Sequence, residues 1–414
     1  MDVSEIGKKI TQLTGVRAIM ADIKESLGAG KSFINLSAGN PLVIPEIGEL
    51  WKSSLSKIME TPDFDSIIGR YGDSQGYQPF VGVVKDYFRQ RYQWDISERN
   101  ILITPGSQAG IFYGTNMFCD QSQPLLLPLN PDYTGYKSSW VSLEDPLTVV
   151  PNTSIVSPHT FKYQVDVSRI RQILTQKKVG AMAFSRPSNP TGNVLEDDVF
   201  HEFASMAKEY DFPIFVDSAY SEPFPGITDV SVDMSLYPNM VYSFSLSKCG
   251  LPGERMGVLV GDEAVIDKLE CFQSNATIHS SRLGQAIAAD VLTEYDFESM
   301  CQRYLKDLYF KKRQCVEDVL THVLGDLDWY LHVHQGGLFS WLWVPQLKRT
   351  DLELYAEAKE KGVLVVPGSM FFHNAESISN KELLNCFRIS LTATDEDIRS
   401  GVQIFAETIK DHLS

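Results

Sequence analysis

A lysine stands just beyond a short, largely apolar segment, in a position where it could act as a nucleophile. Residues 240–244 are typical of a buried strand, and Lys248 follows them in the sequence Ser245-Leu246-Ser247-Lys248-Cys249-Gly250-Leu251-Pro252-Gly253-Glu254-Arg255. Burying an ammonium group is costly, and both burial and nearby cations lower the pKa of a lysine. The neutral amine that results can form a Schiff base with a carbonyl compound. A solvated lysine on a loop is equally compatible with this motif taken alone.

Two other predicted strands are also followed by polar groups. Residues 100–104 lead into Pro105-Gly106-Ser107-Gln108-Ala109, where a helix begins, and residues 212–216 lead into Asp217-Ser218-Ala219-Tyr220. Free amides and the positive end of a helix dipole at Ser107 could bind an anion. Asp217 would place a carboxylate near the phenol of Tyr220. The simpler interpretation is that Ser107 and Asp217 cap helices and that Tyr220 belongs to the core.

These polar groups need a sheet whose strands end at one edge, and the chain predicts one. Short apolar segments alternate with helical periodicity at residues 107–118 and 195–210, which favours a mostly parallel sheet covered on both faces. Ligand-binding groups gather beyond the carboxyl ends of such strands. Residues 258–261 could add an antiparallel strand. The five predicted parallel strands are residues 100–104, 124–129, 179–185, 212–217 and 240–244.

The pattern changes after about residue 281. One helical region is predicted over residues 283–324, and alternating apolar residues after Gly336-Gly337 predict a half-buried antiparallel strand. We expect a smaller α+β domain here, joined by the segment before Pro45. Its remaining predicted elements are a helix at 351–361, strands near 363–366 and 387–391, and a closing helix.

Composition excludes several classes of protein. The 414 residues include 53 acidic and 37 basic residues, giving a formal net charge of −16, which opposes nonspecific nucleic-acid binding. No apolar segment approaches the roughly 18 residues needed to span a bilayer, and residues 1–5 lack signal-peptide features. The six cysteines form no CxxC pair, and His332 and His334 are expected to be surface or interface residues, so no metal site is predicted. We expect a soluble, cytoplasmic protein without a nucleic-acid or membrane partner.

Taken together, the motifs resemble the fold-type I family of pyridoxal-phosphate aminotransferases. The strongest are Ser245-x-Ser247-Lys248 followed by Pro252-Gly253-x-Arg255, and Arg186-Pro187-Ser188-Asn189-Pro190-Thr191-Gly192. The resemblance covers nearly the whole chain. It implies an α/β fold with a mostly parallel seven-stranded sheet flanked by helices in a large domain, residues 46–285. Residues 1–45 and 286–414 would form a smaller α+β domain that closes over the substrate.

The resemblance also implies a role for each matching residue. Lys248 matches the lysine that binds pyridoxal 5'-phosphate covalently and moves the substrate proton, and Asp217 matches the carboxylate paired with the pyridine nitrogen. Tyr220 and Asn189 match the groups that hydrogen-bond the phenolic oxygen of the cofactor. Tyr133 matches the aromatic residue stacked on the ring. The phosphate-binding positions are matched by Ser107, Gln108, Ser245 and Arg255.

Three further matches bear on substrate and assembly. Arg388 matches the arginine that binds the substrate α-carboxylate at two points, with Gly39 and Asn189 beside the same group. Tyr71 matches a tyrosine that reaches the phosphate of the neighbouring subunit, which implies a homodimer. A packed core aromatic is the alternative for Tyr71.

Longer segments, such as residues 217–227 and 336–343, are similar to the branch of the family that exchanges an amino group between valine and pyruvate. That branch produces 2-oxoisovalerate and alanine. Leu36-Ser37-Ala38-Gly39 departs from its more glycine-rich pattern beside the substrate. Aromatic, 2-aminoadipate or kynurenine substrates therefore stay as alternatives. An effector-sensing domain of a transcription regulator is a distant alternative, because no basic DNA-binding region precedes Gly39.

Overall fold

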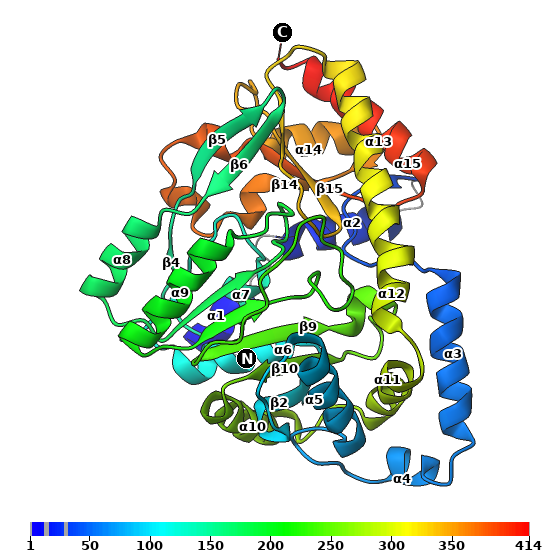
Figure 1. Cartoon of the computed structure of the whole chain (residues 1–414). Coiled ribbons are helices and arrows are strands. Elements are labelled where there is room, and N and C mark those ends of the chain that lie inside the picture. Colours follow the sequence, from blue (N-terminus) through cyan, green and yellow to red (C-terminus); the bar gives the residue numbers. More distant parts are fainter. Residues whose placement is uncertain (1, 12–15, 29–31, 414) are drawn as a thin grey trace.

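The computed structural model describes residues 2–11, 16–28 and 32–413, and its centre is a seven-stranded sheet (Figure 1). The strand order is β2-β10-β9-β8-β7-β3-β4. Only β10 runs antiparallel to its neighbours, which confirms the predicted mostly parallel sheet with one antiparallel strand. The strands are β2 (Ile101–Thr104), β3 (Leu125–Leu127), β4 (Leu147–Thr148), β7 (Ala181–Ser185), β8 (Ile214–Asp217), β9 (Met240–Ser245) and β10 (Gly257–Gly261).

Helices cover both faces of this sheet, and six of its seven strands are buried at every residue; the edge strand β4 is the exception. Alternate residues of a strand enter different cores: in β8, Phe215 belongs to the core under α6 and α10, whereas Ile214 and Val216 belong to the larger core on the other face. The helices of the large sheet are α3 (Pro45–Met59), α4 (Phe64–Gly69), α5 (Gln78–Tyr92), α6 (Ser107–Phe118), α7 (Gly135–Ser139), α8 (Val167–Gln176), α9 (Asp197–Tyr210), α10 (Glu263–Thr277) and α11 (Arg282–Glu294).

A second sheet of six strands lies above the first in Figure 1, in the order β14-β15-β12-β11-β6-β5. Its outer hairpin, β5 and β6, comes from the middle of the chain. It joins this sheet because β6 pairs in parallel with β11. The sequence did not predict this hairpin, and the domain limits at residues 46–285 stay a prediction. The strands are β5 (Asn152–Ser157), β6 (Thr160–Gln164), β11 (Tyr330–His332), β12 (Phe339–Trp343), β14 (Val366–Pro367) and β15 (Cys386–Ser390).

Two predictions for the C-terminal part are wrong in detail. The helical region over residues 283–324 is interrupted at Asp296, whose side chain accepts a hydrogen bond from the Ser299 amide at 3.2 Å and starts a new helix. The predicted strand near residues 363–366 divides: β13 (Val363–Leu364) pairs with β1 (Ile34–Asn35), whereas β14 joins the six-stranded sheet. The remaining helices are α1 (Glu5–Thr11), α2 (Val16–Gly28), α12 (Phe297–Cys301), the π-helical turn at Gln302–Lys306, α13 (Asp307–Leu324), α14 (Asp351–Glu360) and α15 (Asp395–Lys410).

The prediction that His332 lies at the surface or at an interface is wrong. His332 lies on β11, between β6 and β12, and is 3% exposed. Its Nε2 accepts a hydrogen bond from the Tyr163 amide at 3.0 Å, and burial lowers its pKa to about 3. The His334 side chain is also largely buried, against Arg313 and Asp229, so neither histidine lies at the surface.

Within residues 2–11, 16–28 and 32–413, no helix combines the length and the apolar character that a membrane span requires.

Candidate active site

Eleven of the twelve predicted site residues line one cavity of about 370 Å³. The cavity lies at the carboxyl ends of β2, β7, β8 and β9, where the sequence placed the polar groups. Residues far apart in the chain meet there because the parallel strands share this edge. The eleven are Gly39, Ser107, Gln108, Tyr133, Asn189, Asp217, Tyr220, Ser245, Lys248, Arg255 and Arg388.

Lys248 lies in a 3-10 turn, Leu246–Cys249, that directly follows β9. Its Nζ donates a hydrogen bond to the Gly39 carbonyl at 2.8 Å and lies 5.7 Å from the centre of the Tyr220 ring. Burial, together with the positive charge of Arg388, lowers the pKa of Lys248 to about 8, although Asp217 acts in the opposite direction. An appreciable fraction of this amine is therefore uncharged near neutral pH.

Asp217 is the last residue of β8 and is 7% exposed. Its carboxylate accepts hydrogen bonds from the Ala219 amide at 3.1 Å and the Tyr136 hydroxyl at 3.2 Å. Burial raises the pKa of Asp217 to about 6, against these two bonds and the charge of Lys248. A buried carboxylate of this kind is suited to binding a protonated ring nitrogen.

An anion-binding cup forms where α6 begins. Gly106 has a φ of 87°, in the left-handed region that disfavours a residue with a side chain, and a Cβ there would also displace the end of the Arg255 side chain, whose Nη2 would lie 2.6 Å away. No side chain caps the first amides of the helix. Arg255 donates weakly to the Ser247 hydroxyl and the Pro252 carbonyl, both at 3.4 Å. Helix amides, hydroxyls and a guanidinium in one place fit a phosphate group.

Gln108 is in the first turn of α6, but its side chain turns toward α7 rather than into the cup. Its amide donates to the Ser139 hydroxyl and, at 3.4 Å, to the Gly135 carbonyl. The Tyr133 ring meets that of Tyr136 edge to face, with the ring centres 5.4 Å apart.

Arg388 projects from β15 and is 4% exposed. Its guanidinium lies 4.0 Å from the centre of the Phe339 ring and 4.8 Å from that of Phe371, and it donates to the Ser37 carbonyl at 2.9 Å and to Asn189 Oδ1 at 3.1 Å. Burial lowers its pKa to about 10, so it stays charged at neutral pH. A buried cation without a carboxylate partner among the described residues is suited to binding a carboxylate ligand.

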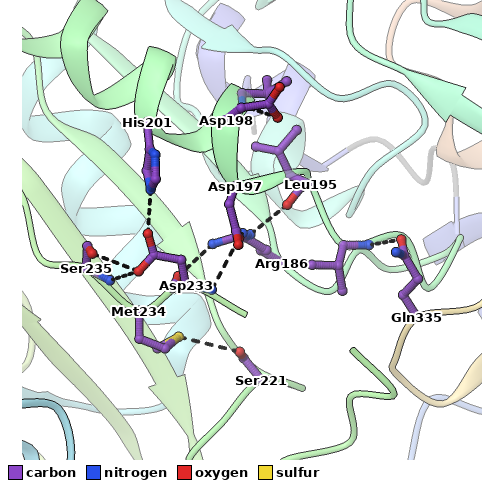
Figure 2. Close-up of polar contacts among 12 residues, drawn as sticks. Arg186, Leu195, Asp197, Asp198, His201, Ser221, Asp233, Met234, Ser235 and Gln335 are labelled. Carbon is purple, nitrogen blue, oxygen red and sulfur yellow. Dashed lines mark hydrogen bonds and ion pairs between the residues drawn. The ribbon is translucent and has the colours of Figure 1, made fainter. Parts of the chain in front are cut away.

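The loop that carries Asn189 is fixed by the buried Arg186 (Figure 2). Arg186 is 1% exposed; it donates to the Leu195 carbonyl at 3.0 Å, to the Asp233 carbonyl at 2.7 Å and to the carboxylate of Asp197. Its guanidinium also lies over the Phe200 ring, 4.4 Å from the centre. These contacts hold the two ends of the loop together.

Several residues around the cavity were assigned no role from the sequence. Phe339 and Phe371 enclose Arg388, and Tyr136 binds Asp217. The alternating pattern of β12 predicts that Phe339 is on a buried face, and Tyr136 follows Tyr133 by about one helical turn. Which group each would contact depends on pairing between distant segments, so the local pattern lacked that signal.

Tyr71 is the one predicted site residue that the structure does not bring to the cavity. It is 82% exposed, which is unlike a packed core aromatic, and its ring and that of His279 meet edge to face, with their centres 5.9 Å apart.

Comparison with known proteins agrees with this architecture. The family model "Aminotransferase class I and II" matches residues 31–405. The chain is similar to the valine–pyruvate aminotransferase of Escherichia coli (strain K12), with 29% identity over 99% of this chain and 98% of the relative. The structure of valine–pyruvate aminotransferase AvtA from Salmonella typhimurium LT2 superposes with a TM-score of 0.84 at 29% identity, covering 94% of this chain and 98% of that one. A Psychrobacter arcticum 273-4 structure, named for amino-acid aminotransferase activity, gives a TM-score of 0.93 at 30% identity, covering 100% and 99%.

The closed loop predicts a clear cost for replacing Arg186 by lysine. A single amino group cannot replace three differently directed donors, so Arg186→Lys should lower the free energy of unfolding by about 1–3 kcal/mol. Urea denaturation measures this change. Arg171→Lys, at an exposed arginine of α8 paired with Glu202 at 2.8 Å, is the matched control and should leave stability unchanged. An equal loss of stability in both variants would contradict the role given to the three donors of the Arg186 guanidinium.

Proposed function

The chain belongs to the class I and II aminotransferases, and on that premise we propose that it transfers the amino group of L-valine to pyruvate, giving 2-oxoisovalerate and alanine. The observation that carries this choice is the charge around the cavity. Among the described residues that line it, three are basic: Lys248, Arg255 and Arg388. We assign one to the cofactor, one to its phosphate and one to the substrate α-carboxylate, which leaves none for a second carboxylate.

The apolar side of the same cavity supports a small aliphatic substrate. Met20, Pro41 and Phe339 line it together with Arg388. A substrate side chain with a second carboxylate would lose its hydration there without gaining an ion pair. This disfavours 2-aminoadipate among the alternative substrates. The full-length similarity to valine–pyruvate aminotransferases supports valine over aromatic donors.

The cofactor of this family is pyridoxal phosphate, and the residues present fit it. We propose that Ser107, Ser245, Arg255 and the backbone amide of Gln108 hold the phosphate, that Asp217 binds the ring nitrogen, and that Tyr133 lies on the ring. Asn189 and Tyr220 would bind its phenolic oxygen, and Lys248 would bind it covalently. The side-chain-free position at Gly106, the buried Asp217 carboxylate and the lowered pKa of Lys248 support these roles. When bound, the cofactor takes up the electron pair left by the broken Cα–H bond.

We assign the proton transfer to Lys248. With the substrate bound, the neutral Nζ of Lys248 would remove the Cα proton as a general base. Arg388 holds the α-carboxylate with two parallel donors and thereby fixes the orientation of the Cα–H bond. Asp217 would stay ionised and keep the ring nitrogen protonated. Water would supply the keto oxygen of the departing oxo acid, the amino group would remain with the cofactor, and pyruvate would then use the same residues in the reverse order.

We also propose a homodimer in which Tyr71 completes the phosphate site of the neighbouring subunit. The exposure of Tyr71, with the exposed Ile278 next to its contact His279, supports a surface that a second chain covers.

The six free cysteines support a reducing compartment, the cytoplasm, which cell fractionation would test.

The proposed substrates predict a spectral cycle. Adding L-valine alone to the pyridoxal-phosphate-loaded protein should convert the absorbance of the pyridoxal form to that of the pyridoxamine form, and pyruvate should restore it. L-Glutamate should leave the spectrum unchanged, because no cation remains for its second carboxylate. Arg388→Lys should keep the cofactor but raise the valine concentration for half-conversion at least about tenfold. Conversion by an aromatic amino acid and not by valine would refute the substrate and leave the family assignment intact.

The pKa of Lys248 predicts how the apoprotein combines with pyridoxal phosphate. Only the neutral amine attacks the aldehyde. The rate of combination should therefore rise with pH, reach half of its maximum at a pH of about 8, and level off at higher pH. Stopped-flow absorbance from pH 6 to 10 measures this, and Lys248→Ala gives the background from other lysines. A midpoint near the ordinary value of a solvated lysine would show that the amine is not buried as described.

The shared site predicts complementation between two defective chains. Tyr71→Ala and Lys248→Ala should each reduce turnover, whereas mixed dimers contain one site with both residues intact. Refolding an equal mixture should therefore restore about a quarter of the wild-type sites. If Tyr71 serves its own chain, or if sedimentation shows a monomer, mixing will restore nothing.

A further inference from the structure

Asp132 is a buried carboxylate beside the cavity that the proposed mechanism does not use. It is 1% exposed and precedes Tyr133. Its oxygens accept four hydrogen bonds: from the Tyr133 amide at 2.8 Å, the Ser185 amide at 3.0 Å, the Ser185 hydroxyl, and the Ser188 hydroxyl at 3.3 Å. Such a set of donors indicates a site built for an ionised acceptor.

Each partner of Asp132 adjoins a residue that faces the cofactor. Tyr133 forms the ring-stacking wall. The Ser185 hydroxyl also accepts a hydrogen bond from the Asn189 amide at 3.2 Å, and Ser188 is the residue before Asn189. One carboxylate therefore joins the two segments that place Tyr133 and Asn189 around the ring.

The segment that Asp132 holds also reaches Asp217. Tyr136 follows Tyr133 by one turn, with its amide donating to the Tyr133 carbonyl at 3.2 Å, and its hydroxyl donates to Asp217 at 3.2 Å. The residues that follow Asp132 therefore carry both the ring-stacking tyrosine and a donor to the second buried carboxylate.

The backbone of Asp132 extends the connection to the substrate side of the cavity. Its amide donates to the Phe371 carbonyl at 3.4 Å, and the Phe371 ring lies against Arg388.

We propose that Asp132 is a positioning residue for the cofactor: it fixes Tyr133 and Asn189 on the ring and anchors the segment that carries Tyr136, whose hydroxyl binds Asp217. This inference rests on the proposed function, because it takes the cavity to be the cofactor site.

The electrostatics of Asp132 agree with a position kept for function. Burial raises its pKa to about 7, and the facing carboxylate of Asp217 acts in the same direction, whereas its donors oppose the shift. The other titratable groups at this point are Tyr133 and Tyr136, whose pKa values are also raised by burial. A buried ionisable group carries a desolvation cost that an apolar side chain would avoid.

Affinities for two probes separate positioning of the ring from general folding. Pyridoxamine phosphate contacts both the ring site and the phosphate cup, whereas inorganic phosphate contacts the cup alone. Asp132→Asn presents an amide donor to existing donors, so the dissociation constant of pyridoxamine phosphate for the full-length apoprotein should rise about tenfold or more. The dissociation constant of phosphate should stay within about twofold, since the cup at α6 is untouched.

The circular dichroism band of bound pyridoxal phosphate gives an independent readout, because it depends on the tilt of the ring. Asp132→Asn should change its intensity. Asp351→Asn is the matched control: Asp351 is 4% exposed and accepts a hydrogen bond from the Ser369 amide at 2.7 Å, yet it does not line the cavity. The control should alter neither the affinities nor the band.

Ser185→Ala and Ser188→Ala keep the proposal testable if Asp132→Asn does not fold. Ser185→Ala removes the hydroxyl that bonds both Asp132 and Asn189, although the Ser185 amide keeps its bond to Asp132. It should therefore weaken the binding of pyridoxamine phosphate more than Ser188→Ala does. Wild-type affinity for pyridoxamine phosphate in Asp132→Asn and Ser185→Ala, or an equal loss of both probes, would overturn the proposal. Failure of valine to react would refute the proposed substrate without affecting these results.

Discussion

Holding Lys248, Asp217 and Arg388 away from water is the constraint on which the rest of the structure depends. Burial shifts the pKa of Lys248 to about 8, that of Asp217 to about 6 and that of Arg388 to about 10. Isolated charges would not stay buried, so each needs fixed partners. Those partners come from elements at the carboxyl edge of the large sheet and from the smaller sheet. The active-site geometry is therefore only as accurate as the packing of both sheets.

The loop around Asn189 is the piece that joins the two sheets at the site. Arg186 closes it on the side of the large sheet, and Asn189 accepts a hydrogen bond from Arg388 of β15 on the other. The backbone amide of Gln335, just before β12, donates to the Gly192 carbonyl at 2.9 Å. The Gln335 side chain accepts a hydrogen bond from the Val194 amide at 3.1 Å (Figure 2). A loop gains such rigidity only when both of its sides are hydrogen-bonded, which explains the buried arginine at its base.

The sequence was informative wherever function follows from the end of a strand. Lys248, Asp217 and Ser107 could be placed because short apolar segments mark the strands, and parallel strands bring their ends to one edge. The place of the hairpin β5–β6 in the sheet was missed because β6 pairs with β11, whose residues come 171 positions later in the chain, as His332 does with Phe161. The same non-local pairing buried His332 against expectation. The donors around Asp132 come from residues 133, 185 and 188, and their convergence depends on the strand order β8-β7-β3, which periodicity does not encode.

A single site that serves both halves of the proposed reaction restricts the acceptor as strictly as the donor. In a transfer of this kind, the donor leaves as its oxo acid before the acceptor oxo acid enters, so donor and acceptor must fit the same walls. The described cavity presents Arg388 to one carboxylate and Met20, Pro41 and Phe339 to the side chain. A methyl group such as that of pyruvate meets these walls at little cost, whereas a second carboxylate must shed its hydration against them. Under the proposed function, the charges that fix the orientation of valine also select an acceptor with one carboxylate.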